Sequence, residues 1–209
     1  QIHRNDKHLS TIRHIFVNQQ KNSKAEISQI CTGGSFIRNN CKISHLGVNC
    51  ESKLNGLSLA GNGNHIDNHT LVEHLHPHCN SDEMYKNIVA DGGTTIFNGK
   101  VYVAKDAQKT NAYQSNKNLL LGPEAKSYSK PELEIYADDV KCSHGSTTGH
   151  NDTEALFYMR ARGIKESEAR KLLMLAFAND LLERIEHEDL LDYLKEIVLQ
   201  KFEQLMQES

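Results

Sequence analysis

The pattern of apolar and polar positions divides the chain into two regions that meet near residue 150. Before that point apolar residues recur in short alternating or β-branched stretches, and nothing sustains a helical period for long. These stretches predict six strands: Ala25–Ile30, Lys42–Val48, Leu54–Leu59, Thr94–Phe97, Lys100–Val103 and Leu133–Tyr136. The turn signals between them are Gly33-Gly34, Asn55-Gly56, Gly61–Gly63, Asp91–Gly93, Asn98-Gly99 and Gly122-Pro123. This spacing is typical of a sandwich, a barrel or a β-solenoid, and the pattern alone does not choose among them.

From residue 151 onward the apolar positions recur at helical spacing. Asn151 or Asp152 is expected to cap a first helix, and Gly163 is expected to end it. The three predicted helices are Thr153–Arg162, about Ser167–Ile185 and about Glu188–Met206. The predicted apolar face of the second comprises Ala169, Leu172, Leu173, Ala176, Phe177 and Leu181. Because all three helices are amphipathic, they are expected to pack against one another, the β-region or a partner.

Glycine and proline follow the same division, since 12 of the 13 Gly and all three Pro precede residue 151. We therefore predict a β-domain over residues 1–150 and a helical domain over residues 151–209. The chain begins at Gln1 rather than Met, so an N-terminal portion of a longer protein is expected to be missing from it. No secretory signal opens the sequence.

Charge is almost balanced, with 24 Lys+Arg against 27 Asp+Glu and a net charge of −3. No basic stripe is visible, so nucleic-acid binding is not expected. The longest apolar runs, Leu119–Leu121 and Leu172–Ala178, are too short to cross a bilayer, and no membrane association is expected. Five cysteines without a C-x-x-C pair argue against a disulfide framework and for a reducing cytoplasm. They are Cys31, Cys41, Cys50, Cys79 and Cys142.

A cluster of possible metal ligands lies between His65 and His78, which holds five of the 12 histidines. With Asp67, Glu73 and Cys79 these residues could supply the four ligands of a zinc site. On a strand, two triplets would each share a face: His65, Asp67 and His69, and His74, His76 and His78. No H-E-x-x-H or C-x-x-C motif fixes their geometry, so we interpret them as polar strand positions and expect no stoichiometric metal.

A second candidate site is Asp138–Gly145, where adjacent carboxylates precede Cys142 and His144. At positions i and i+2 of a strand, Cys142 and His144 would share a face and could bind a soft or borderline metal or form a thiolate nucleophile. Two ligands do not complete a metal site, so a second chain or mobile ligands would be needed. The alternative is a buried strand cysteine beside a turn histidine.

The first predicted helix combines aromatic residues with arginines. Such a surface is typical of a docking site, although ordinary packing explains it equally well. The candidate anchors are Phe157, Tyr158, Arg160 and Arg162. Enzyme motifs do not occur: the sequence has no nucleotide-binding glycine motif and no G-x-S-x-G. Asp138 and Asp139 would point to opposite faces of a strand, which argues against a glycosidase pair.

Five stretches are long enough to compare with known families: Lys130–Gly145, Leu156–Ile164, Ile96–Val101, Ala107–Asn116 and Leu119–Leu121. They resemble the signatures of the SufB/SufD family of iron–sulfur cluster assembly proteins, and weaker similarity extends back to about Ser35. SufB-like chains carry a cysteine in the stretch that matches Tyr113–Asn116, and they read E-H-E-A where this chain reads C-S-H-G at Cys142–Gly145. Both departures are those of the SufD branch.

The resemblance implies a right-handed parallel β-helix followed by a C-terminal α-helical domain. It also implies a cytoplasmic scaffold that is not an enzyme. SufD-like proteins pair with SufB through their β-helices and bind the SufC ATPase through the C-terminal helices. The anchors Phe157, Tyr158, Arg160 and Arg162 are therefore candidate SufC contacts, and an isolated chain could form a homodimer.

The resemblance further implies that a transient iron–sulfur cluster forms at the SufB interface and that this isolated chain binds no cofactor tightly. In the family, the histidine that matches His144 lies at that interface and is linked to cluster formation with a SufB cysteine. His144, and secondarily Cys142, are the expected assembly ligands. The alternative from another functional class is a zinc-dependent enzyme or metal-binding protein that uses the His65–His78 region.

Overall fold

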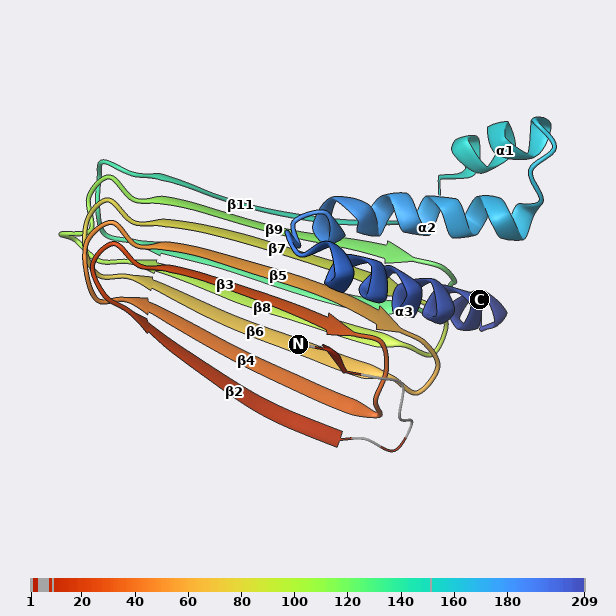
Figure 1. Ribbon diagram of the computed structural model, residues 1–209, viewed down its shortest axis with the longest axis horizontal. Coiled ribbons are helices and arrows are strands. Elements are labelled where there is room, and N and C mark those ends of the chain that lie inside the picture. The colour runs from red at the N-terminus through yellow and green to blue at the C-terminus, as the bar shows by residue number, and fades with distance from the viewer. Residues whose placement is uncertain (1, 4–7, 9, 151, 209) are drawn as a thin grey trace.

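A computed structural model describes residues 2–3, 8, 10–150 and 152–208. The chain first winds through two facing parallel sheets as a β-solenoid, and three helices follow (Figure 1). Sheet A contains β1 (Ile2–His3), β3 (Lys24–Cys31), β5 (Glu51–Ala60), β7 (Asn80–Val89), β9 (Asn111–Leu120) and β11 (Lys141–His150), in that order. Sheet B contains β2 (Ser10–Gln19), β4 (Phe36–His45), β6 (His65–His74), β8 (Thr94–Val103) and β10 (Lys126–Ile135).

Each strand pairs in parallel with the strand two places later in the chain, and no hairpin occurs among the described strands. For example, Ile37 pairs with Ile66 on the next turn, and His65 pairs with Thr94. Stacked parallel turns were predicted even though Asn-Gly pairs favour antiparallel hairpins. The structure confirms the predicted parallel β-helix with helices after it.

The solenoid interior is filled by alternate side chains of both sheets. One interior cluster contains Cys41, Ile43, Leu54, Val72, Tyr85 and Phe97. The opposite face of sheet A carries a second apolar set, including Leu57, Leu59 and Ile88, against which the helices pack. Sheet A is therefore covered on both faces, as expected for a parallel sheet.

Two predicted turns are wrong, because Asn55-Gly56 lies inside β5 and Asn98-Gly99 lies inside β8. The predicted strands Thr94–Phe97 and Lys100–Val103 are consequently one strand. A Cβ at Gly56 would lie 2.2 Å from the Tyr85 ring, and one at Gly99 would lie 2.5 Å from the Phe97 ring. These glycines make room for aromatic side chains inside the solenoid instead of turning the chain. The predicted strand Lys42–Val48 covers only the end of β4 and runs into the next turn.

The helices are α1 (Thr153–Ala161), α2 (Glu166–Leu182) and α3 (Glu188–Gln207), close to the predicted bounds. The Asp152 carboxylate caps α1 by accepting from the backbone N–H groups of Glu154 and Ala155, both at 2.9 Å. The other predicted cap, Asn151, lies outside the described residues. Gly163 ends α1 with φ +87°, as predicted. None of the helices described has the length and apolar character needed to cross a membrane.

The predicted apolar face of α2 is only partly correct. Ala169 and Leu181 are buried, but Leu172 is 40% exposed. The residues buried in addition are Met174, Ala178 and Leu182. Helix α2 contacts α1, α3 and sheet A at once, so its apolar residues do not form the single stripe that periodicity assumes.

Candidate functional site

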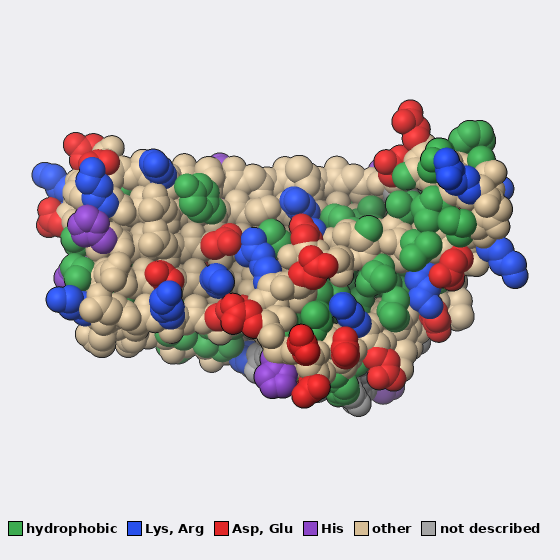
Figure 2. All heavy atoms as spheres, turned by 45° about the horizontal axis from the view of Figure 1, so that its top comes forward, with side chains coloured by type: hydrophobic (Ala, Val, Ile, Leu, Met, Phe, Trp, Pro, Cys, Tyr) green, Lys and Arg blue, Asp and Glu red, His purple; other side chains and the backbone are tan. Residues whose placement is uncertain are grey.

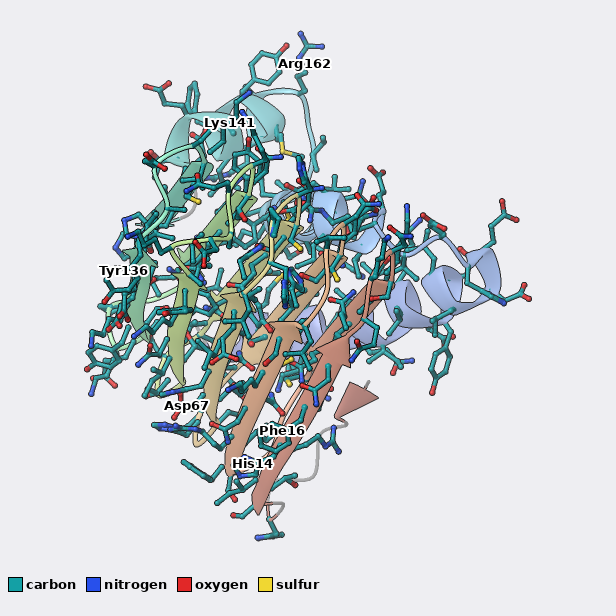
Figure 3. All side chains as sticks on the ribbon, turned by 90° about the vertical axis from the view of Figure 1, so that its left-hand side faces the viewer. His14, Phe16, Asp67, Tyr136, Lys141 and Arg162 are labelled. Carbon is teal, nitrogen blue, oxygen red and sulfur yellow. The ribbon has the colours of Figure 1, made fainter. Side chains whose placement is uncertain are left out.

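The candidate site lies at the end of the solenoid where β10 and β11 are the last strands of their sheets. Figure 3 shows Lys141 at the start of β11 and Tyr136 just after β10, far from His14 and Phe16 of β2 at the opposite end. In the part of the chain that the structure describes, no strand pairs with the outer edge of β10 or β11. Both strands therefore present an unpaired row of backbone groups.

The backbone of β11 directs every second residue to this free edge. Lys141 N–H donates to the carbonyl of Thr110, the residue before β9, at 2.9 Å, so the odd-numbered residues of β11 bond toward β9. The even-numbered residues, including Cys142 and His144, then direct their N–H and C=O groups outward. This edge can accept a strand of another chain without rearrangement.

The edge of β10 is less suited to such pairing. Lys126 N–H donates to the Gly93 carbonyl and Tyr136 N–H to the Val103 carbonyl, so even-numbered residues bond to β8. Odd-numbered residues face the free edge, and one of them is Pro131, which has no N–H. The two edges at this end of the solenoid therefore differ, and β11 offers the longer uninterrupted row of donors.

Cys142 and His144 share a strand face, as predicted, and it is the interior side of sheet A. Their register partners on β9 are Ala112 and Gln114, both buried inside the solenoid. Because no further turn covers β11, His144 is exposed while Cys142 is half-buried. Burial raises the pKa of the Cys142 thiol, which keeps it protonated at neutral pH and makes it a weaker metal ligand than a thiolate.

The carboxylates Asp138 and Asp139 lie in the turn before β11 and not on a strand, so the expectation that they point to opposite strand faces is wrong. The Asp138 carboxylate accepts from Gln108 Nε2 at 2.8 Å, and Asp139 forms an ion pair with Lys109. These contacts hold two turns of the solenoid together. Because both carboxylates are engaged in these contacts, Cys142 and His144 remain the candidate ligands of this segment.

Directly beneath His144 lies a buried polar pair that the sequence analysis missed. Gln114 Nε2 donates to Glu83 Oε2 at 2.5 Å, and Thr70 Oγ1 donates to the same oxygen at 3.2 Å. Burial raises the pKa of Glu83 to about 7, although both hydrogen bonds lower it. No local sequence signal reveals this pair, because Glu83 and Gln114 lie 31 residues apart and meet only through the register of β7, β9 and β11.

The His65–His78 region divides between a strand and a turn. The first triplet lies on one face of β6, as predicted, with Asp67 accepting from Arg38 Nη1 at 2.5 Å and lying 3.0 Å from His69 Nε2. The second triplet is wrong, because β6 ends at His74 and the chain turns at Pro77. His76 and His78 lie in that turn, where His78 has φ +61°.

His74 points into the solenoid. Its Nδ1 lies 3.2 Å from Nδ1 of His45, and its Nε2 lies 2.9 Å from Ser81 Oγ. Burial lowers the pKa of His74 to about 3 and that of His45 to about 4, so both rings are neutral and hydrogen-bonded. Across the ranges 2–3, 8, 10–150 and 152–208, no three His, Cys, Asp or Glu side chains gather as a metal site.

The aromatic and arginine residues of α1 lie on an exposed surface. Phe157 is 74% exposed and Tyr158 is 58% exposed, and the Arg162 guanidinium lies 4.6 Å from the centre of the Tyr158 ring. Arg160 forms an ion pair with Glu166 at 3.2 Å. Figure 1 shows α1 projecting beyond β11, and Figure 2 shows hydrophobic side chains gathered at the end of the molecule where α1 and α2 lie.

Comparisons with known proteins place this arrangement in a family. Residues 1–177 match the model described as "SUF system FeS cluster assembly, SufBD core domain". The chain is 42% identical over 158 residues to the iron–sulfur cluster assembly protein SufD of Escherichia coli, which covers 76% of this chain and 37% of that protein. It is 36% identical over 182 residues to the chloroplastic protein ABCI7 of Arabidopsis thaliana, covering 87% of this chain and 38% of that protein.

A third relative is the SufBD family protein slr0076 of Synechocystis, which is 35% identical over 167 residues, covering 80% of this chain and 37% of that protein. The chain thus spans less than two fifths of the length of these relatives. The parallel solenoid, the family model and the identity to E. coli SufD agree with one another. The chain therefore belongs to the SufBD core domain family of SUF-system iron–sulfur cluster assembly proteins, and within that family it is SufD-like.

Proposed function

We propose that the chain acts as a non-catalytic scaffold that pairs with SufB through the open end of the solenoid and contributes His144 to the assembly of a nascent iron–sulfur cluster. The observation that carries this proposal is the free edge of β11, on which an exposed histidine lies beside an unpaired backbone row. A strand edge is a ready template for β-pairing with a second chain. The same edge would let an isolated chain form a homodimer.

Imidazole suits the proposed role because a neutral ring nitrogen ligates iron. His144 is exposed, so it can reach a group that a second chain presents across the edge. Cys142 lies two residues away on the same face and is the weaker candidate, since burial favours its protonated form. The cluster is cargo shared between two chains, so we expect none to remain on this chain alone.

We further propose that α1 is the contact for the SufC ATPase. An exposed Phe and Tyr beside Arg160 and Arg162 form the kind of aromatic and arginine surface that carries binding energy at protein interfaces. Leu172 of helix α2, which packs against α1, is a further exposed apolar residue of the helical region. Deleting residues 152–209 from the full-length protein should abolish SufC binding and leave the solenoid folded.

The test of the cluster role is His144→Ala in the full-length protein. It should abolish cluster formation in a strain that depends on the SUF system, while the variant still co-purifies with SufB and SufC, because a ligand is lost and no interface core is removed. The matched control is His150→Ala, which removes a histidine from the same strand and face. Normal growth with His144→Ala at wild-type expression would show that this histidine is only structural.

A further inference from the structure

The interior of the solenoid contains a short file of polar side chains, Glu83, Gln114 and His144, that ends at the open end. Parallel register places Glu83 of β7 beside Gln114 of β9, and Gln114 beside His144 of β11. Side chains in register on neighbouring parallel strands point the same way and lie about 4.8 Å apart. Glu83 and Gln114 are buried, whereas His144 is exposed at the open end. Gln114 thus lies between a buried carboxyl group and the proposed cluster ligand.

The hydrogen bonding of this file is incomplete. Glu83 Oε2 accepts from both Gln114 Nε2 and Thr70 Oγ1. Among the described residues, Glu83 Oε1 and Gln114 Oε1 are buried without a hydrogen-bond partner. A buried acceptor without a donor is destabilising, so both atoms favour any state that provides one.

Among the described residues, no cation is one of the groups that act on the Glu83 carboxyl group. Thr70 of β6 and Gln114 of β9 donate hydrogen bonds to it, Leu54 of β5 is its register partner, and the Cys41 thiol of β4 and the Tyr85 hydroxyl interact with its charge. Burial raises the pKa of both Cys41 and Tyr85, so neither carries charge at neutral pH. Asp82, the neighbouring carboxylate, raises the pKa of Glu83 further. The charge state of Glu83 therefore changes close to neutral pH.

Resting on the proposed function, we propose that Glu83 and Gln114 are positioning residues that orient the His144 ring for the nascent cluster. When Glu83 is charged, it accepts a hydrogen bond from the Gln114 amide N–H. Gln114 Oε1 is then left to accept a hydrogen bond from a ring N–H of His144. One ring nitrogen is then held as a donor and the other is presented to iron. When Glu83 is protonated, its O–H donates to Gln114 Oε1 after the amide rotates. Gln114 then offers N–H to His144 and competes for the nitrogen that iron needs.

The test compares the full-length protein in its SufB–SufC complex with Glu83→Gln. Cluster assembly by the wild-type complex should rise about tenfold between pH 6 and pH 8, the change in the charged fraction of one carboxyl group with a pKa of about 7. The pH step should be lost in Glu83→Gln, which carries no proton to release. Infrared spectroscopy should show a carboxylic-acid C=O band that titrates with the same midpoint and is missing from that variant.

Two further variants keep the outcome decisive. Gln114→Leu should also lose the pH step in assembly while its Glu83 band still titrates, which separates positioning from folding. Glu51→Gln removes an exposed carboxylate on β5, away from the open end, and should behave as wild type. A wild-type pH step in Glu83→Gln would overturn the inference. Full activity of His144→Ala would instead overturn the proposed function, so the two failures can be told apart.

Discussion

The fit between two aromatic rings and two glycines shows how single residues control the solenoid interior. Tyr85 lies against Gly56 of the neighbouring turn, and Phe97 lies against Gly99 of its own strand. The two ring centres are 4.8 Å apart, so they fill the interior together. Any side chain at either glycine would have to displace a ring in a closely packed interior.

Gly56→Ala should therefore destabilise the full-length protein by about 2 kcal/mol, the usual cost of adding a methyl group to a filled core. The measurement is the free energy of unfolding from denaturant titration. Gly149→Ala is the matched control, because a Cβ there meets no atom within 4 Å and should change stability by less than about 0.5 kcal/mol. Equal stability of the two variants would contradict this account of the interior.

The same glycines show the limit of local sequence signals. Asn-Gly is a strong turn signal, but the ring that requires Gly56 lies 29 residues away on the next turn, where no local pattern reveals it. The shared face of Cys142 and His144 was predictable, since parity within a strand is local. The Glu83–Gln114 pair was not predictable, because its two residues lie on different turns and their spacing is set by the length of a solenoid turn.

At the scale of elements, the turn length itself could have been found. Three glycines with positive φ, Gly34, Gly63 and Gly92, recur every 29 residues, as do the register partners His45 and His74. No repeat consensus is evident in the sequence, because the stacking of turns restrains only whether a residue faces inward or outward and leaves its identity free. The helices were predicted closely because helical spacing, and for α1 the Asp152 cap, are local signals, whereas the face of α2 depended on three neighbours.

The two edges at the open end lead to a prediction about β11. Ser146 directs its N–H to the free edge, by the same alternation that directs that of His144. Ser146→Pro should weaken co-purification of full-length protein with SufB at least tenfold, because it removes an edge donor, as Pro131 does on β10. It should leave the inner ladder to β9 intact, so the unfolding temperature should change little.

Ser146→Ala is the control for this prediction. It removes the hydrogen bond between the hydroxyl groups of Ser146 and Ser129, at 2.8 Å, but retains the backbone N–H. Wild-type SufB binding by Ser146→Ala together with weak binding by Ser146→Pro would assign the effect to the backbone edge. If both variants bind SufB as tightly as wild type, pairing does not use the edge of β11.

At the scale of the whole molecule, two ion pairs hold the helical region on sheet A. The cation of one pair lies on β7, and the cation of the other lies just after α2. Lys86 of β7 donates to the Phe177 carbonyl at 2.6 Å and pairs with Asp180 of α2. Arg184, just after α2, pairs with Asp82 of β7 at 2.9 Å. Strand β7 thus holds the helices on its outer face and carries Glu83 on its inner face.

Asp180→Asn should loosen this attachment, because it leaves the Lys86 ammonium buried with its counter-charge removed. We expect a loss of about 2 kcal/mol, less than for a fully buried pair since Asp180 is half-exposed to water. Hydrogen exchange of the full-length protein should speed up in α2 and α3 and remain unchanged in β5 and β9. Combining Asp180→Asn with Lys86→Met should recover much of the protection, because no buried charge then remains.

The control is Glu203→Gln, which breaks the exposed pair with Lys171 and should alter exchange little. Equal exchange in Asp180→Asn and Glu203→Gln would mean that apolar packing alone holds the helices on the solenoid.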